Sequence, residues 1–500
     1  MLSIYLNLAS SFFGPQNNVP RQHSLRHSAS NVPSQSVVQP PTDPRLCACY
    51  PLPNATRISR LKLERAHPYL AAILAIASPA HARDFFVHDG DRVVFLGDSI
   101  TQQMFYTNYI ETYTLSRHPS WKLTFRNVGW GGDTSWLRQR KPTDEMQLFA
   151  ADDEAQAKIV NSAVQYGLAR DVLPLRPTVV TVDFGMNDFG YQSFRPDILR
   201  AYVRSETEIS RVLVGNGARP VFLTTQPIEE KRPDPNEDVH NISLKKFADA
   251  LGEMAEREKV EFADQFDPYM QAMLRTRSST VGGGADAVHP GPAGHTIMAW
   301  AILKALGATP LVSTVTINGQ ALKVEATQGC RISNLKADGK AISFDRLDDA
   351  LPMPVDSRAE PALGVVPFTH DLNAYELMIG GLPEGNYSVS IDGEAAATVS
   401  AGDLAQGWNL AYMAGPITRQ SRELLSLVEK KNNLYFKRWR DVQLFNAPDW
   451  AVESSDFESR RKAEMARLDR EISALEAKID AQRLPQQRHF VVTPEAKDAE

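Results

Sequence analysis

The sequence predicts an α/β domain with a doubly wound, mostly parallel sheet between residues 83 and 308. Short apolar runs that stop at glycine or polar residues indicate buried parallel strands. Segments with helical spacing alternate with these runs, as a doubly wound sheet requires. The expected strands are residues 93–96, 123–129, 178–184, 219–226 and 260–264, and the expected helices are residues 197–214, 241–259, 268–275 and 296–306.

Residues suited to catalysis follow several of these strands. Ser99 comes directly after the first strand, in Gly-Asp-Ser, and Gly132 comes shortly after the second. Asn187 follows the third strand, and His289 precedes the last helix. Ligands of open α/β sheets bind at the carboxyl ends of the strands. Ser99 is therefore the candidate nucleophile, and the other residues are its candidate partners.

These residue types together suit acyl transfer. A serine hydroxyl becomes a good nucleophile when a base takes its proton, and His289 can be that base. Asp286, three residues before His289, can fix the imidazole tautomer and stabilise the imidazolium. The backbone N–H groups of Ser99 and Gly132, with the side-chain amide of Asn187, can form an oxyanion hole.

Four segments carry a family resemblance: residues 97–99, 127–133, 185–188 and 286–289. In order and separation they resemble the four blocks of the SGNH (GDSL-type) serine hydrolases. The resemblance implies a three-layer α/β/α sandwich of flavodoxin-like type with about five strands. It also implies ester or thioester hydrolysis without a metal or a cofactor, with the residues around Ser99 in the roles given above.

Three further residues lie inside these blocks and are candidate substrate contacts. Asp98 and Asp188 could face the substrate, but helix N-caps or loop braces are the favoured alternative for each. Trp130 lies between two glycines of the second block and could form an aromatic wall beside the acyl group. The alternative for Trp130 is a place in the core.

The length and net charge of the chain limit the number of domains and the kinds of partner that we expect. A chain of 500 residues is too long for one core and predicts two or three domains. The formal net charge of −6 gives no basic footprint for nucleic acid. We also expect no membrane span, because no run approaches the roughly 18 apolar residues that one requires.

The first 82 residues are not expected to belong to the folded enzyme. Residues 1–56 are rich in Ser, Pro, Asn and Gln, which predicts a disordered extension or a mis-called start. Residues 57–82 contain a basic cluster, a short apolar run and Ala80-His81-Ala82, the pattern of a secretory signal peptide. The alternatives are a short buried helix, a genuine extension or a transit peptide. The signal peptide predicts a secreted or periplasmic protein.

Cleavage after Ala82 would change the cysteine content and the charge. Cys330 would be the one cysteine left, so no internal disulfide could form. Seven basic and two acidic residues would be lost, which takes the formal net charge from −6 to −11. This charge disfavours anionic polymers as substrates and leaves neutral or acetylated glycans open.

The chain changes character after residue 308. Residues 309–415 contain short alternating runs that end at Asn318-Gly319 and Asp392-Gly393, which are hairpin signals and predict a small β-rich unit. This unit either contacts carbohydrate or braces the first domain. Bracing is favoured, because no tryptophan-rich platform is evident.

Residues 416–484 are expected to form a helical hairpin, and residues 485–500 a tail. The second helix carries a seam of apolar residues at three- and four-residue spacing. This seam either pairs with the preceding helix or serves as a dimerisation arm. It consists of Met465, Leu468, Ile472, Leu475 and Ile479.

The sequence thus predicts a secreted serine esterase that works through an acyl-enzyme and deacetylates a carbohydrate. Its substrate would be a small-molecule or polysaccharide ester. A lipase, an acyl-thioesterase or a sugar acyltransferase of the same family is the nearest alternative. A catalytically silent glycan-binding protein is the alternative from another class.

Overall fold

The computed structural model describes residues 84–230, 234–277, 281–448 and 456–495. The expected extension and signal peptide lie outside the described residues. Nowhere in the described ranges does a helix combine the length and the apolar composition needed to cross a membrane.

A five-stranded sheet forms the centre of the first domain, and all its neighbouring strands run parallel. Its order is β2-β1-β3-β4-β5, which confirms the predicted α/β fold. In this order the chain changes direction across the sheet between β1 and β3, where a crevice opens at the strand ends. The strands are β1 (Arg92–Gly97), β2 (Thr124–Asn127), β3 (Val179–Asp183), β4 (Arg219–Leu223) and β5 (Glu261–Ala263).

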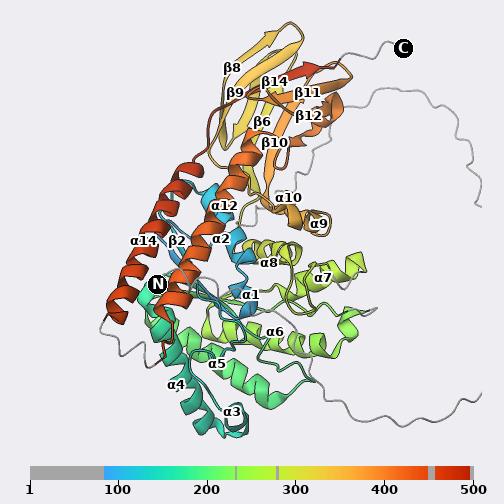
Figure 1. The fold of residues 1–500 in the computed structure, drawn as a ribbon. Coiled ribbons are helices and arrows are strands. Elements are labelled where there is room, and N and C mark those ends of the chain that lie inside the picture. The colour runs from blue at the N-terminus through green and yellow to red at the C-terminus, as the bar shows by residue number, and fades with distance from the viewer. Residues whose placement is uncertain (1–83, 231–233, 278–280, 449–455, 496–500) are drawn as a thin grey trace, which may run out of the picture. The chain divides into compact units, whose positions relative to one another are not determined.

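Helices cover both faces of this sheet (Figure 1), so the domain has three layers. One face carries α2 (Phe105–Arg117) and α8 (Pro292–Ala305). The other carries α4 (Asp153–Asp171), α5 (Pro196–Gly215) and α6 (Val239–Glu258). The shorter helices of this domain are α1 (Ser99–Gln102), α3 (Glu145–Ala150), η2 (Leu173–Leu175), η3 (Pro235–Glu237) and α7 (Phe266–Thr276).

The β-rich unit is a sandwich of two sheets around its own apolar core. Its first sheet has the order β13-β10-β6-β7 and its second the order β12-β11-β14-β9-β8. Both predicted hairpins are present, since β6 pairs antiparallel with β7 and β11 with β12. The strands are β6 (Leu311–Asn318), β7 (Lys323–Gln328), β8 (Cys330–Asp338), β9 (Ala341–Asp348), β10 (Ala374–Gly380), β11 (Asn386–Ile391), β12 (Glu394–Ser400), β13 (Trp408–Asn409) and β14 (Arg488–Pro494).

The sequence-based boundaries differ from the structure in two places. Residues 353–372, between β9 and β10, pack against the core of the first domain, and they contain η4 (Ser357–Ala359), α9 (Glu360–Leu363) and α10 (Phe368–Leu372). The expected tail contributes β14, which pairs with β9 and β11 inside the sandwich. In Figure 1 this last strand, drawn in red, lies among strands of the yellow and orange part of the chain. A short helix, α11 (Ala401–Gln406), follows β12.

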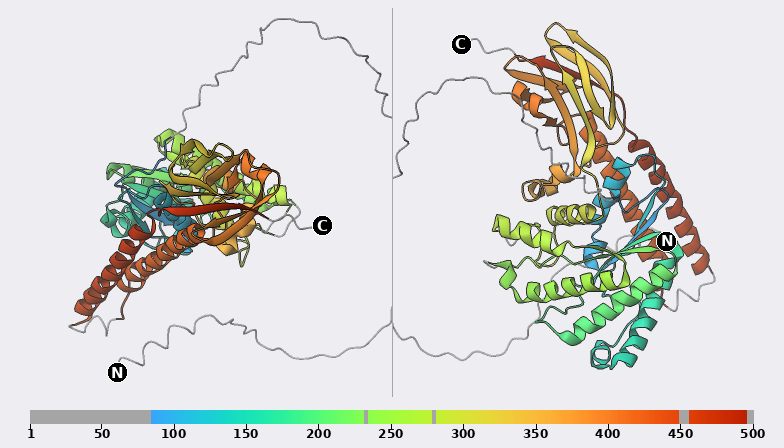
Figure 2. Two further views of the ribbon diagram at one scale, coloured as in Figure 1. Left: turned by 90° about the horizontal axis from the view of Figure 1, so that it is seen from above. Right: turned by 180° about the vertical axis from the view of Figure 1, so that it is seen from behind.

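The predicted helical hairpin is present and packs against the first domain. It consists of α12 (Pro416–Phe436), a π-helical turn η5 (Lys437–Gln443) and α14 (Phe457–Gln482), and its two long helices run side by side in Figures 1 and 2. Leu468, Ile472 and Ile479 of the predicted seam are buried. Because α14 lies against α12, the seam pairs within the chain. Dimerisation stays a prediction.

Candidate active site

Ser99 lies where β1 passes into α1, at the crevice of the central sheet. Asp98 caps α1, because its side chain accepts a hydrogen bond from the Ile100 N–H at 2.9 Å. The turn needs a glycine at position 97: a Cβ there would lie 2.2 Å from Thr101 Oγ1 and 2.7 Å from the Asp183 carbonyl oxygen. Close packing between β1, β3 and α1 therefore holds Ser99 at the carboxyl edge of the sheet.

The structure brings Ser99, His289 and Asp286 together. Ser99 Oγ lies 2.9 Å from His289 Nε2. Nδ1 of His289 lies 3.0 and 3.1 Å from the two carboxylate oxygens of Asp286, which also accepts the backbone N–H of His289 at 2.8 Å. With a proton on Nδ1 shared with Asp286, Nε2 can accept the Ser99 hydroxyl hydrogen.

Asp286 is fit to remain an anion. Its partial burial would raise its pKa, but hydrogen bonds from His289 and Val288 outweigh burial, and the pKa lies below its ordinary value. The Asp286 side chain is 57% exposed and that of His289 is 35% exposed. Water therefore screens this pair, and its main contribution is to orient the imidazole.

The loop that carries His289 is anchored by residues that sequence reasoning did not single out. Glu229 is buried, and its carboxylate accepts hydrogen bonds from the Gly282 N–H at 2.7 Å and the Tyr269 hydroxyl at 2.5 Å. Gln226 donates from its side chain to the Val288 carbonyl at 3.0 Å. Thus the polar segment after β4 braces the histidine loop. Residues 231–233 within it lie outside the description.

Gly132, the second candidate oxyanion donor, lies in a tightly held turn. Its φ is +75°, a left-handed conformation that favours glycine. Arg138 donates from Nε to the Gly132 carbonyl at 2.8 Å, and Gln102 accepts the Gly131 N–H at 2.6 Å. Within the described residues, the backbone N–H groups of Ser99 and Gly132 make no hydrogen bond. Both are therefore available to donate to an oxyanion.

Asn187 lies beside these donors, but its amide is already engaged. Its Nδ2 donates to the Asp133 carbonyl at 3.0 Å and to the Asp98 carboxylate at 3.1 Å. Donation to an oxyanion would therefore exchange one of these two partners. Burial, the largest cause, raises the pKa of Asp98 to about 7, so near neutral pH its hold on the amide varies with protonation.

Asp98 and Asp188, the two carboxylates named as candidate substrate contacts, are buried. Each is 2% exposed. Asp188 accepts hydrogen bonds from the Ser135 N–H at 2.9 Å and the Gly185 N–H at 3.0 Å, and thereby joins the third block to the segment that follows the second. Burial raises the pKa of Asp188 to about 6. This burial and these hydrogen bonds agree with the favoured alternative, in which the two carboxylates cap a helix and brace loops. Contact with a substrate stays a prediction.

Trp130 packs against other parts of the chain instead of forming a free wall. The guanidinium of Arg440 lies 3.3 Å from the centre of the Trp130 ring. The Trp439 ring is edge-on to the Trp130 ring, and the two ring centres are 5.9 Å apart. Both residues come from the helical hairpin. These contacts favour the alternative, a packing role for the half-buried Trp130, and a substrate contact stays a prediction.

A small hollow adjoins the oxyanion loop. It has a volume of about 430 Å³ and is lined by residues 138, 139 and 142–146. Arg138, which bonds the Gly132 carbonyl, also pairs with Glu145 at 2.8 Å on this hollow. Thr143 adds a hydroxyl and Met146 an exposed thioether. Polar and apolar groups are thus available beside the loop that carries Gly132.

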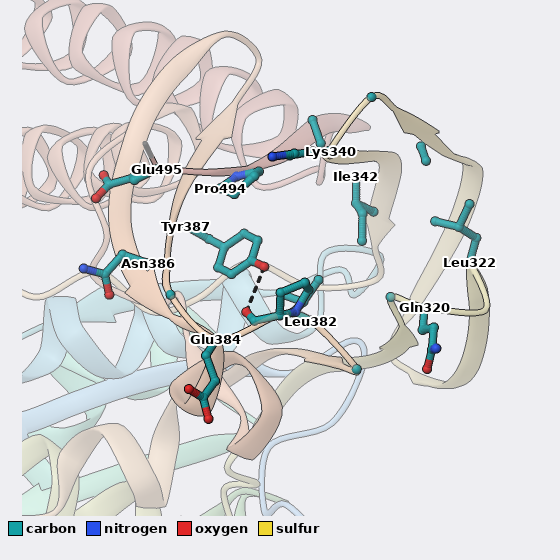
Figure 3. Close-up of a pocket in the computed structure, with 17 residues that line it drawn as sticks. Gln320, Leu322, Lys340, Ile342, Leu382, Glu384, Asn386, Tyr387, Pro494 and Glu495 are labelled. Atoms are coloured by element: carbon teal, nitrogen blue, oxygen red, sulfur yellow. Dashed lines mark hydrogen bonds between the residues drawn. The ribbon is translucent and has the colours of Figure 1, made fainter. Parts of the chain in front are cut away.

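A larger hollow, of about 1390 Å³, lies in the β-rich unit (Figure 3). It is lined by loops at one end of the sandwich, from residues 319–322, 337–342, 381–387 and 494–495. The Tyr387 hydroxyl donates to the Pro383 carbonyl at 3.0 Å across it. None of the candidate catalytic residues lines this larger hollow, so it is not the candidate active site.

One group of side chains has the spacing of a metal site. Ligand atoms of Glu230, Asp238 and His240 lie within 4.8 Å of one another. His240 Nδ1 is 2.9 Å from the Glu230 carboxylate, and Asp238 caps α6, so these groups already have protein partners. None of them is among the residues that surround Ser99.

Comparison with known proteins agrees with this geometry. Residues 95–297 match the model of the GDSL-like lipase/acylhydrolase family, and the match contains Ser99, Gly132, Asn187, Asp286 and His289. Residues 95–297 form a GDSL-like lipase/acylhydrolase domain. The chain is therefore an esterase-type hydrolase, as its sequence predicts. A search of curated proteins returned no match.

Solved structures resemble this hydrolase to different extents. A gut microbial diltiazem-metabolizing enzyme is 27% identical with a TM-score of 0.66, covering 83% of this chain and 100% of its own. An acetylxylan esterase from Geobacillus stearothermophilus is 19% identical with a TM-score of 0.35, covering 44% of this chain and 96% of its own. An α/β hydrolase from the metagenome of Lake Arreo, Spain, is 20% identical with a TM-score of 0.34, covering 45% and 98%.

Proposed function

We propose that Ser99 is the nucleophile of carboxylic ester hydrolysis. His289 Nε2 takes the Ser99 hydroxyl proton while Oγ attacks the carbonyl carbon, and Asp286 holds the imidazolium. The N–H groups of Ser99 and Gly132, joined by Asn187, stabilise the oxyanion. His289 then protonates the departing alcohol, and a water activated by the same base hydrolyses the acyl-enzyme. The observation that carries this proposal is the 2.9 Å contact between Ser99 Oγ and His289 Nε2.

We further propose that the alcohol is a carbohydrate and the acyl group acetate. The hollow beside Gly132 supports this: Arg138, Glu145 and Thr143 offer donors and acceptors that suit sugar hydroxyls. Most side chains that line this hollow are polar, which favours a short acyl chain over a lipid. The signal-peptide pattern supports a secreted or periplasmic enzyme that meets such polymers.

The first experiment uses nitrophenyl esters of increasing acyl length with the purified wild type and Ser99→Ala. We expect acetate to be hydrolysed fastest and the variant to lose activity by several orders of magnitude, because the nucleophile is gone. Preference for long chains would favour a lipase or thioesterase. Equal activity of the two proteins would contradict the assignment of Ser99, and equal inertness would revive the silent glycan-binding protein.

The carbohydrate part is tested with Glu145→Gln. Glutamine lacks the charge of the carboxylate and is a weaker acceptor for a sugar hydroxyl. Its side-chain oxygen can still accept the hydrogen bond from Arg138, so the contact of Arg138 with the Gly132 carbonyl is kept. We expect kcat/KM for a peracetylated xylose to fall about tenfold, the value of one lost hydrogen bond to a charged group, with nitrophenyl acetate unaffected. Release of acetate is measured for both substrates. A parallel loss on both substrates, or none on either, would speak against the hollow as the sugar site.

A further inference from the structure

Trp130 is fixed within the oxyanion loop by its backbone. Its N–H donates to the Gly97 carbonyl at 2.9 Å, and its carbonyl accepts the Asp133 N–H at 3.0 Å. Gly131, the next residue, lies close to the nucleophile: a Cβ there would be 3.8 Å from the Ser99 Cβ. Any shift of Trp130 would therefore move the peptide that carries the Gly132 N–H.

The indole of Trp130 is held by the C-terminal hairpin. Arg440 stacks on the ring at 3.3 Å from its centre, and Trp439 contacts it edge-on at 5.9 Å. Both residues lie in η5, the π-helical turn that continues α12. Such turns are rare and are found frequently at functional sites. About three hundred residues of sequence separate this turn from the loop that it contacts.

The environment of Arg440 is unlike that of its neighbours. Arg438, in the same turn, pairs with Asp469 at 2.7 Å. Arg140 and Arg170 also lie over the indole, at 5.7 and 5.1 Å from its centre, but both are paired with Asp171. Arg140 is paired with Asp133 as well. In the described part of the chain the Arg440 side chain makes no ion pair or hydrogen bond. Its guanidinium stacks on the Trp130 ring and also feels the charges of Arg170, Asp441 and Asp171. A half-buried cation in this position is stabilised by the electron-rich face of the ring.

We propose that Arg440 and Trp439 are positioning residues for the Gly132 oxyanion donor and act through Trp130. This inference rests on the proposed esterase function of Ser99. In this arrangement the hairpin completes the active site of the hydrolase domain, because it presses the loop into the conformation in which the Gly132 N–H faces the reacting carbonyl. Oxyanion donors act over a narrow range of distances, so a loosened loop should slow the chemical step more than it weakens substrate binding.

The test compares Arg440→Ala and Arg440→Lys with Arg438→Ala as the matched control from the same turn. Kinetics with nitrophenyl acetate should show kcat of Arg440→Ala reduced about tenfold or more, part of what loss of a whole oxyanion donor costs, with KM within about twofold. Arg440→Lys should recover part of kcat, since a lysine keeps the cation–π contact. Arg438→Ala should match the wild type in both constants.

A second readout separates positioning from simple destabilisation. The affinity for a phenylboronic acid, which forms a tetrahedral adduct with an active-site serine, should weaken in Arg440→Ala in parallel with kcat. Should Arg440→Ala fold poorly, Trp439→Phe and Arg440→Lys carry the same test. Folded variants with wild-type kcat and boronate affinity would overturn the inference. A wild type whose activity does not depend on Ser99 would instead overturn the proposed function itself.

Discussion

At the scale of single residues, the site depends on which polar groups are exposed and which are buried. Asp286 and His289 lie at the surface, where water screens their charges. Asp98 and Asp188 are each 2% exposed, and burial raises their pKa values to about 7 and about 6. Asp286 orients the base His289. Asp98 and Asp188 hold the loops that carry the candidate oxyanion donors.

His295 is a buried neighbour of the site whose titration can be measured. It is fully buried and bonds to the Gln103 side chain at 3.0 Å, and burial lowers its pKa from 6.5 to about 3. As the pH falls, His295 therefore binds a proton near pH 6.5 in the unfolded chain but only near pH 3 in the folded chain. This difference makes the free energy of unfolding rise with pH across that interval.

His295→Gln removes this titration and keeps a side chain that can bond to Gln103. The free energy of unfolding of wild type minus that of the variant should rise by about 1 kcal/mol per pH unit between roughly pH 4 and 6, and should be level above about pH 7. Urea unfolding at a series of pH values measures it. A difference that does not change with pH would contradict the assigned pKa.

At the scale of elements, the sequence predicts the parallel strands well and some helices poorly. β1, β3 and β4 are short, mostly apolar runs, and the structure contains all five expected strands. Helix α2 gives no amphipathic signal, because it is buried on nearly all sides and carries polar residues such as Asn108 and Glu111. Their partners on α12, Asn432 and Lys431, are about three hundred residues away. No local pattern records such a pairing.

The same limit applies to the site. The triad and the oxyanion residues follow strand ends in recognisable motifs, so they could be named from the sequence. Arg138, Glu229 and Arg440 could not, because each acts through a contact with a loop distant in sequence or through a backbone carbonyl. Strand β14 was expected as a tail for a similar reason: its partners are more than ninety residues away.

A buried ion pair joins α12 to α2, and we expect it to contribute to the stability of the fold. Lys431 Nζ lies 2.7 Å from the Glu111 carboxylate, and both side chains are almost fully buried. Lys431→Met leaves Glu111 without its cation and should lower the free energy of unfolding by about 3–5 kcal/mol. Urea unfolding checks this value. The double variant with Glu111→Leu should regain part of the loss, and a double variant as unstable as the single one would contradict the pairing.

At the scale of the whole molecule, three parts contribute to one enzyme. The hydrolase domain supplies the reacting groups, the helical hairpin packs on its α2 edge and on Trp130, and residues 353–372 tie the β-rich unit to the same core. A solved enzyme that is 27% identical aligns with 83% of this chain, so the similarity extends beyond the hydrolase domain. The bracing role favoured for the β-rich unit fits these contacts.

The central claim is that Ser99, activated by His289, forms a covalent bond with the substrate acyl group. The most direct measurement is the intact mass of the protein after reaction with a fluorophosphonate, followed by peptide mapping, for wild type, Ser99→Ala and His289→Ala. The account predicts one adduct on Ser99 in the wild type, none in Ser99→Ala and a strongly slowed reaction in His289→Ala. An adduct at another residue, or equal labelling of wild type and Ser99→Ala, would contradict it.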